Sequence, residues 1–284
     1  NGSGNSSRTL ISALGFVPPE AELLIDEPET ALVARNVDRL FRLINKPEYA
    51  VCDILARNYA NAIRVHNATG SSSNLMLHMP AVMRHAGFDV SLFDYESIRD
   101  EHPVPDIFAH SLTDNRDTYV LAQQWLAGQH HGMTSIYKVL DTLRVPMDLD
   151  APTVSGQTWR ERLQTIIQPV SPQLPQERSV IRIHPVRDIS GTDILRGNFF
   201  SSCTLKVSGM ATAQYQRFDG HVFVVRYYEN EHPCNSELHS SNLVETLGNM
   251  PELTPDLLAA LRRFNHAPAE ENVAEMIANG TDVV

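Results

Sequence analysis

The chain has 284 residues, of which 42% are hydrophobic and 20% are charged, a balance typical of a folded globular protein. This composition excludes a disordered chain, a collagen-like fibre and a simple coiled coil. The 34 acidic residues outnumber the 23 Lys and Arg residues, so the formal net charge is −11. An acidic chain repels phosphate backbones, and no run of Lys or Arg is long enough to offset this repulsion. We therefore expect no nucleic acid as a partner.

The cysteine pattern and the apolar pattern indicate a cytoplasmic protein. Three cysteines, Cys52, Cys203 and Cys234, lie far apart and form no CxxC pair. A sparse, odd set of cysteines is typical of a reducing compartment rather than of a disulfide framework. No apolar run reaches the roughly 18–20 residues that span a bilayer, and the polar N-terminal residues do not have the pattern of a signal peptide. We therefore expect no membrane association.

Amphipathic spacing in the first half of the chain predicts helices joined by short loops. Ser6 and Ser7 are N-cap candidates for a first helix, and Gly15 stands where a glycine commonly ends such a helix. Pro28 is a favoured first residue for the next helix, and Pro47 ends that helix. The same spacing predicts further helices over residues 52–65, 75–86, 118–126 and 135–143.

The pattern changes after a segment that is rich in proline. Five prolines occur over residues 146–175. Beyond them, short runs rich in β-branched and aromatic residues are separated by turn signals, which is typical of strands. These predicted strands cover residues 180–183, 203–207 and 221–228.

The predicted fold class is α/β with two domains. A helix-rich α/β domain is expected over residues 1–165, because the 3.6-residue spacing there gives way to short β-branched runs beyond it. A β-rich, barrel-like domain is expected over residues 166–284, together with two terminal helices over 254–264 and 270–278.

One polar segment between two predicted helices has the composition of a binding site. Asn67-Ala-Thr-Gly-Ser-Ser-Ser-Asn74 contains one glycine, four hydroxyl groups and two carboxamides. Gly70 would let the backbone approach a ligand, and the following helix would present free N–H groups, so the segment suits an oxyanion or a polyol. A solvated helix-capping turn has the same composition, and the residues alone leave both interpretations open.

A second polar segment, residues 228–239, follows a predicted strand. It contains three carboxylates (Glu229, Glu231 and Glu237), two imidazoles and a thiol. Carboxylate oxygens at the end of a strand suit a hard cation such as Mg²⁺. A polar surface loop is the alternative interpretation of this segment.

Several separate segments match motifs of one enzyme family in the same order. Asn67–His78 looks like A-T-G-G-S-T-N-x-x-L-H, and Thr153-Val-Ser-Gly-Gln-Thr158 looks like T-V-T-G-K-T. Ile194-Leu-Arg-Gly-Asn198 looks like L-R-G-N. Val224-Val-Arg226 followed by Glu237-Leu-His239 looks like V-V-R…P-E-L-H. The order of these segments resembles the dihydroxy-acid/phosphogluconate dehydratase family of iron–sulfur hydro-lyases. The first ten residues also resemble the helix that follows a cluster cysteine in that family.

The resemblance implies a hydro-lyase that converts a sugar acid or a related 2,3-dihydroxy acid into a 2-keto-3-deoxy acid. The eleven-residue gap from Arg226 to Glu237 resembles the phosphogluconate branch, which implies a substrate like 6-phosphogluconate. The implied cofactors are an Fe–S cluster, whose iron accepts the leaving hydroxyl, and a Mg²⁺ that holds the substrate. We expect a small sugar-acid substrate as partner and a homodimer or a higher homo-oligomer.

By the same resemblance, Glu237 is the metal ligand, and Ser72, Ser73, Asn74 and His239 bind the substrate. The chain also departs from the family pattern. Its cysteines do not fall in the cluster motifs, and the T-D-G-R-x-S-G motif that carries the serine base is not found. Catalytic residues are therefore not assigned, and the chain alone is expected to be inactive. It is either part of a working dehydratase or a divergent, non-catalytic relative that binds a ligand or a partner. A small-molecule binding module of other ancestry is a third interpretation.

Overall fold

The structure is a computed structural model. It describes residues 3–22, 27–72, 75–108, 124, 131–170, 178–185, 192–195 and 203–206. Contacts between residues divide the chain into two units, Asn1–Gly191 and Thr192–Val284. This division lies beyond residues 165–166, where the sequence predicts a domain boundary, and that boundary stays a prediction.

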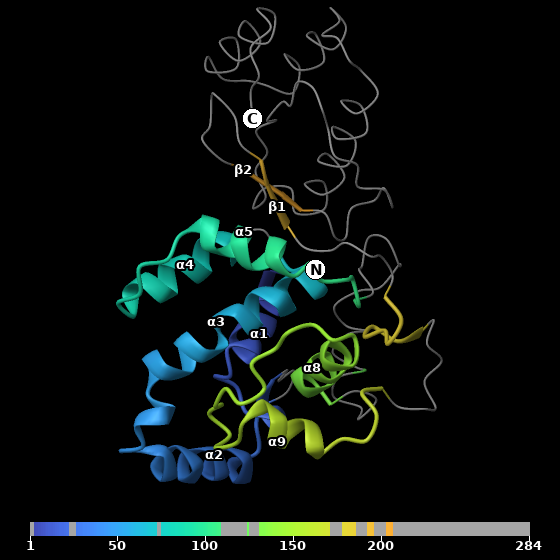
Figure 1. The fold of residues 1–284 in the computed structure, drawn as a ribbon. Coiled ribbons are helices and arrows are strands. Elements are labelled where there is room, and N and C mark those ends of the chain that lie inside the picture. The colour runs from blue at the N-terminus through green and yellow to red at the C-terminus, as the bar shows by residue number, and fades with distance from the viewer. Residues whose placement is uncertain are drawn as a thin grey trace, which may run out of the picture. The chain divides into compact units, whose positions relative to one another are not determined.

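The first unit is built from helices (Figure 1). They are α1 (Ser3–Ala13), α2 (Thr30–Leu43), α3 (Val51–Ala68), α4 (Leu75–His85), α5 (Leu92–Glu101), α8 (Met133–Thr142) and α9 (Trp159–Gln164), with short 3₁₀ turns η1 (Pro19–Ala21) and η2 (Pro47–Tyr49). The helices predicted over residues 52–65, 75–86 and 135–143 are confirmed as α3, α4 and α8. The helix predicted over 118–126 lies outside the described residues, apart from Gln124.

Two predicted helix starts are wrong by a few residues. Ser6 and Ser7 were predicted as N-caps, but α1 begins at Ser3 and includes them both. The Ser6 hydroxyl accepts a hydrogen bond from the backbone of Ser72 rather than from its own helix. Pro28 is predicted as the first residue of α2, but that helix begins at Thr30 with Glu29 as its N-cap. Pro28 therefore precedes the helix.

Glycine ends α1 as predicted, and its position also requires the absence of a side chain. Gly15 has φ = +83°, and the N–H of Phe16 bonds to the carbonyl of Ile11, which closes the C-terminal turn. A Cβ atom at Gly15 would lie 3.2 Å from the carbonyl oxygen of Pro152. The end of α1 therefore packs directly against the loop around Pro152.

Two helices that the spacing did not predict each begin with a capping box. In α5, Ser91 is the N-cap and exchanges hydrogen bonds with Asp94. In α9, Thr158 and Glu161 do the same. The signature of Ser or Thr followed three residues later by an acidic residue is readable in the sequence. Both helices are short, so their apolar spacing is weak.

The core of the first unit surrounds α3, which contacts α1 and α5. Each fully buried aliphatic side chain contributes roughly 1.5–3 kcal/mol by leaving water. Tyr137 of α8 stacks on Trp159 of α9, with ring centroids 3.7 Å apart. The buried aliphatic set includes Leu10, Ile54, Ile63, Met76, Ile136 and Leu140.

A buried ion pair joins three segments of this core. The side chains of Glu22 and Arg162 are each 1% exposed, and Arg162 Nη2 lies 2.8 Å from Glu22 Oε1. Glu22 Oε2 accepts a hydrogen bond from the backbone N–H of Met133 at the start of α8. Arg162 also donates to Thr134 Oγ1 and lies over the ring of Trp159. The pair therefore holds the segment after η1, the start of α8 and α9 together.

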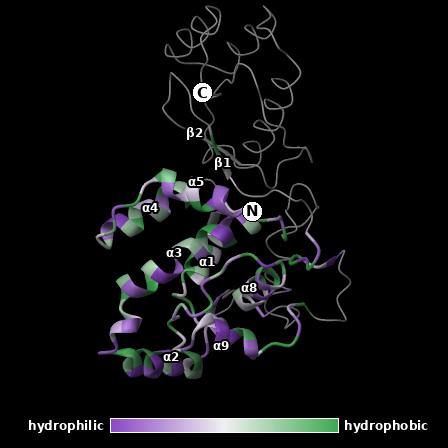
Figure 2. Cartoon of the chain, viewed as in Figure 1, coloured by the Kyte–Doolittle hydropathy of each residue, from purple (hydrophilic) through white to green (hydrophobic). Residues whose placement is uncertain are grey.

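Helix α2 differs from the other helices because none of its fourteen residues, all of which the structure describes, is buried. Hydrophobic and hydrophilic residues both occur along it in Figure 2. Its exposed apolar side chains are spaced three or four residues apart and form one row. This α2 row consists of Val33, Val37, Leu40 and Phe41, together with the C-cap residue Ile44.

In the second unit, the structure describes one antiparallel pair of strands. β1 (Thr192–Leu195) pairs with β2 (Cys203–Lys206) in the register Thr192↔Lys206 to Leu195↔Cys203. β2 confirms the predicted strand at residues 203–207, whereas β1 was not predicted. The predicted strand over 221–228 and the two predicted terminal helices lie outside the described residues.

The strand predicted over residues 180–183 is wrong. The structure has only an isolated bridge there, between Phe108 and Ile181. Two backbone groups of this segment bond to side chains rather than to a neighbouring strand: the N–H of Val180 donates to Gln124 Oε1, and the carbonyl of Ile181 accepts a bond from the Ser179 hydroxyl.

Within the described ranges, the structure contains no helix that is both long and apolar enough to cross a membrane.

The buried ion pair gives a stability prediction. Replacing Arg162 with Met leaves the Glu22 carboxylate buried without its cation, which should lower the free energy of unfolding by about 3–5 kcal/mol. The control is Arg160→Met in the same helix, because Arg160 pairs with Asp150 at the surface and its side chain is 53% exposed. Denaturant unfolding measures both variants. Equal, small losses would contradict the role given to the buried pair.

Candidate functional site

Helix α3 carries polar side chains on its buried faces. Asn58, Asn61, His66 and Asn67 are each at most 2% exposed. A buried polar group without a hydrogen bond costs about 1–3 kcal/mol, so these four side chains must find partners in other segments. Their partners lie in the loop before α9, in α9, in the turn after α3 and in α5.

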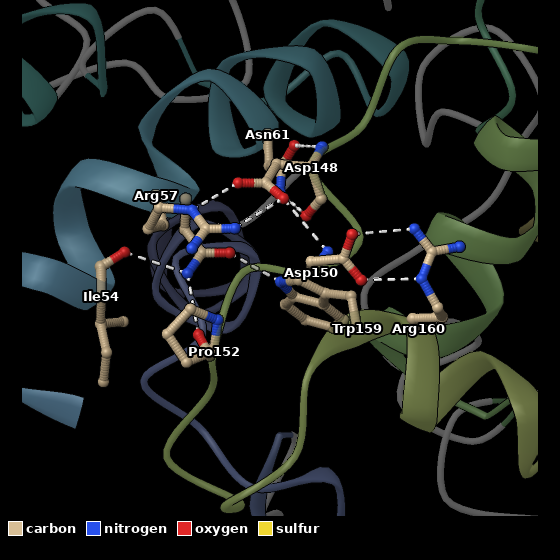
Figure 3. A network of polar contacts seen from close by, with 9 residues as sticks. Ile54, Arg57, Asn61, Asp148, Asp150, Pro152, Trp159 and Arg160 are labelled. Atoms are coloured by element: carbon tan, nitrogen blue, oxygen red, sulfur yellow. Dashed lines mark hydrogen bonds and ion pairs between the residues drawn. The ribbon is translucent and has the colours of Figure 1, made fainter. Parts of the chain in front are cut away.

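Asn58 and Asn61 hold the loop before α9. Figure 3 shows Asn61 beside Asp148 in this network. Asn61 Nδ2 donates to the carbonyl of Asp148 at 2.9 Å, and the N–H of Asp148 donates back to Asn61 Oδ1 at 2.8 Å. Asn58 donates to the carbonyl of Pro152 at 3.0 Å and accepts a bond from Trp159 Nε1 at 2.6 Å. These bonds fix the path of the chain through Asp148 and Pro152.

Two surface ion pairs extend this network, as Figure 3 shows. Arg57 bonds to the Asp148 carboxylate through Nε and Nη2, at 2.6 and 3.0 Å. Arg160 bonds to Asp150 in the same bidentate way. The hydrogen bond from Arg160 lowers the pKa of the Asp150 carboxyl, and the bond to Asp148 raises the pKa of Arg57. Both pairs are exposed, so solvent screens them.

The loop leads into Thr153–Thr158, one of the segments that resemble a family motif. The Thr153 hydroxyl and N–H both donate to the carbonyl of Gln157, and Gly156 has φ = +78°. The N–H of Val154 donates to the carbonyl of Gly15 at 2.8 Å. This motif is therefore a tight loop that rests on the end of α1.

The other polar segment forms the turn after α3. Gly70 has φ = +54°, and its N–H donates to the carbonyl of Asn67. The Thr69 hydroxyl donates to the carbonyl of Val65 at 2.8 Å and lies 2.9 Å from the Ser71 hydroxyl. Thr69, Gly70 and Ser71 are buried. Residues 69–71 therefore end α3 as a capping turn, but this turn is buried rather than solvated.

Of the predicted substrate-binding residues, the structure describes only Ser72. This residue is half-buried. Its N–H donates to Ser6 Oγ of α1 at 3.3 Å. Its carbonyl oxygen lies 3.0 Å from His66 Nε2 and accepts a bond from the N–H of Leu75 at 3.1 Å. The backbone of Ser72 is thus held by α1, α3 and α4.

The other predicted site residues lie outside the described part of the chain. They are Ser73 and Asn74, which follow Ser72 directly, and Glu237 and His239 in the second polar segment. Their assignments stay predictions.

A buried tyrosine completes the polar wall behind Ser72. Tyr95 of α5 is 1% exposed, its hydroxyl lies 2.7 Å from His66 Nδ1, and it donates to Asn67 Oδ1. The rings of His66 and Tyr95 meet edge to face, with centroids 5.4 Å apart. The sequence analysis missed both residues. The capping box at Ser91 marks the start of the helix that carries Tyr95, but no local signal pairs the two side chains.

The described residues do not fit an Fe–S cluster or a Mg²⁺ ion. Among them, no group of three or more His, Cys, Asp or Glu side chains could hold a metal. Cys52 is exposed on α3, and its thiol donates to the carbonyl of Ala86. The side chain of Cys203 and the whole of Cys234 and Glu237 lie outside the described part.

Comparison with known protein families shows which family the chain belongs to. The sequence pattern of the dihydroxy-acid/6-phosphogluconate dehydratase N-terminal region matches residues 1–162. The chain therefore belongs to the dihydroxy-acid/6-phosphogluconate dehydratase family, which confirms the resemblance seen in its motifs.

Individual relatives are similar over most of the chain. A dihydroxy-acid dehydratase of Prochlorococcus marinus (strain MIT 9313) is 31% identical over 289 residues, covering 98% of this chain and 48% of that protein. A second, from strain MIT 9303, is 31% identical over 73% of this chain and 36% of its own length. A dihydroxy-acid dehydratase of Nitrosomonas eutropha is 28% identical over 81% of this chain and 39% of its own length. The chain thus spans about half or less of the length of these relatives.

The cap of α5 gives a prediction with a defined pH dependence. The hydrogen bonds from the N–H and hydroxyl of Ser91 lower the pKa of the Asp94 carboxyl. The ionised cap therefore stabilises the fold above the unfolded-chain pKa near 4, and this contribution is lost as the pH falls through the lower folded value. Asp94→Ala should cost at most about 1 kcal/mol at pH 6, because Asp94 is exposed.

Denaturant unfolding at pH 6 and at pH 3 checks this prediction. The difference between Asp94→Ala and the unaltered protein should narrow at pH 3. The control is Asp89→Ala, because the Asp89 side chain is fully exposed and its carboxylate lies 3.7 Å from the Arg84 guanidinium. A difference that is the same at both pH values would contradict the role of the ionised cap.

Proposed function

We propose that the chain is part of a hydro-lyase that removes water from a 2,3-dihydroxy acid. The observation that carries this proposal is family membership over residues 1–162, together with a family motif whose Ser72 backbone is held on both sides. The relatives named above are dihydroxy-acid dehydratases. In such a reaction a proton leaves C2 and the hydroxyl leaves C3, and the resulting enol tautomerises to a 2-keto-3-deoxy acid.

The described residues support a part in substrate binding. A dihydroxy acid presents a carboxylate and hydroxyl groups, which need hydrogen-bond donors and acceptors at fixed positions. The hydroxyl of Ser72 stands on a backbone that three other segments hold. Ser73, Asn74 and His239 are proposed to share this task on the strength of the motif alone.

The finer parts of the proposal rest on the motifs. They are a sugar acid such as 6-phosphogluconate as substrate, an Fe–S cluster that supplies Lewis-acid chemistry when bound, and a Mg²⁺ held by Glu237. We also propose a cytoplasmic location, which the sparse cysteines support, and a homo-oligomer. A second copy that covered the α2 row would remove its exposed apolar side chains from water, which supports the last point.

The experiment uses the full-length protein with a branched 2,3-dihydroxy acid, gluconate and 6-phosphogluconate as separate substrates. Formation of a 2-keto acid, measured as its hydrazone, should occur with at least one of them. Ser72→Ala should lower kcat/KM roughly tenfold, mainly through KM, because one hydrogen bond to the bound substrate is lost.

The control for this variant is Ser97→Ala. Ser97 is exposed on α5, and its hydroxyl donates only within that helix, to the carbonyl of Phe93. No keto acid from any of the three substrates would contradict the proposed reaction. An unchanged KM in Ser72→Ala, beside an active unaltered protein, would instead remove Ser72 from the binding site.

A further inference from the structure

We propose that His66 and Tyr95 are positioning residues that set the orientation of Ser72 for substrate binding. The inference rests on the proposed function and adds to it two buried residues that touch no substrate. The observation that carries it is a chain of side-chain contacts. Asn67 of α3 contacts Tyr95 of α5, Tyr95 contacts His66 of α3, and His66 contacts the backbone of Ser72 in the turn after α3.

The bond between His66 and Ser72 has a defined direction. A backbone carbonyl oxygen only accepts hydrogen bonds, so His66 Nε2, at 3.0 Å, carries a proton and donates it. The same oxygen accepts the N–H of Leu75, and the N–H of Ser72 donates to Ser6. Among these bonds, only the one from His66 is donated by a side chain.

Tyr95 fixes the imidazole ring that makes this bond. Its hydroxyl lies 2.7 Å from Nδ1, and its ring packs against the His66 ring at an interplanar angle of 85°. The hydroxyl donates its single proton to Asn67 Oδ1, so it accepts the bond from His66 Nδ1 and is itself held by α3. His66, Asn67 and Tyr95 are each at most 2% exposed. Burial removes water as a competing partner, and the ring therefore keeps one orientation.

The two ends of His66 can be tested separately. The amide nitrogen of Gln lies where Nε2 of His lies, whereas the amide nitrogen of Asn lies where Nδ1 lies. His66→Gln therefore keeps a donor toward the carbonyl of Ser72. His66→Asn keeps a donor toward Tyr95 but loses the bond to Ser72. A role only in core stability would make the two variants similar.

Kinetics of the full-length protein give the first readout. With the dihydroxy acid that the unaltered protein turns over best, His66→Asn and Tyr95→Phe should raise KM roughly tenfold, while kcat changes less than about threefold. His66→Gln should stay within about threefold of the unaltered protein in both constants. His85→Asn is the control, because His85 is exposed on α4.

Amide hydrogen exchange gives the second readout, which does not need activity. Exchange in the peptide that covers residues 66–72 should become faster in His66→Asn and should stay near the unaltered rate in His66→Gln. A peptide from α8 serves as the internal reference for overall stability.

The outcomes separate the inference from the proposed function. If no substrate is turned over, the proposed function fails, and the exchange readout alone decides the positioning role. Equal effects of His66→Asn and His66→Gln in either readout would overturn it. So would a loss confined to kcat, or unchanged exchange in residues 66–72 of His66→Asn.

Discussion

The hydrogen-bonding demand of the polar side chains buried on α3 is the constraint on which the rest of the first unit depends. Asn58, Asn61, His66 and Asn67 lie among apolar side chains, where an unpaired donor or acceptor is costly. Each one is paired with a group that local structure does not supply, such as the backbone of Asp148 or the hydroxyl of Tyr95. The helix therefore organises loops as well as filling the core.

Helix α1 connects the two regions that α3 organises. Near its start, Ser6 accepts the N–H of Ser72, and at its end the carbonyl of Gly15 accepts the N–H of Val154. Three segments that resemble family motifs, at residues 1–10, 67–78 and 153–158, thus meet through α1 and α3. These three segments, which are far apart in the sequence, are therefore in contact in the structure.

Much of the first unit could be predicted from the sequence, because its signals are local. Spacing predicts α3, and Gly15 marks the end of α1. The partners of the buried polar residues could not be predicted, because Asn61 and Asp148 are 87 positions apart and His66 and Tyr95 are 29 apart. Of the candidate site, the motif supplied Ser72, whereas no local signal pairs His66 with Tyr95 or with the Ser72 backbone. The predicted β-rich domain stays a prediction.

Equilibrium unfolding of Asn61→Leu tests the central claim most directly. Leu matches Asn in shape but removes the bond from Asn61 to the carbonyl of Asp148 and leaves the Asp148 N–H without its acceptor. The account predicts a loss of about 2 kcal/mol or more in the free energy of unfolding. The exposed neighbour Arg57→Leu should change it little, since its partner carboxylate is solvated. An Asn61→Leu protein as stable as the unaltered one would contradict the claim that the buried amides of α3 hold the loops.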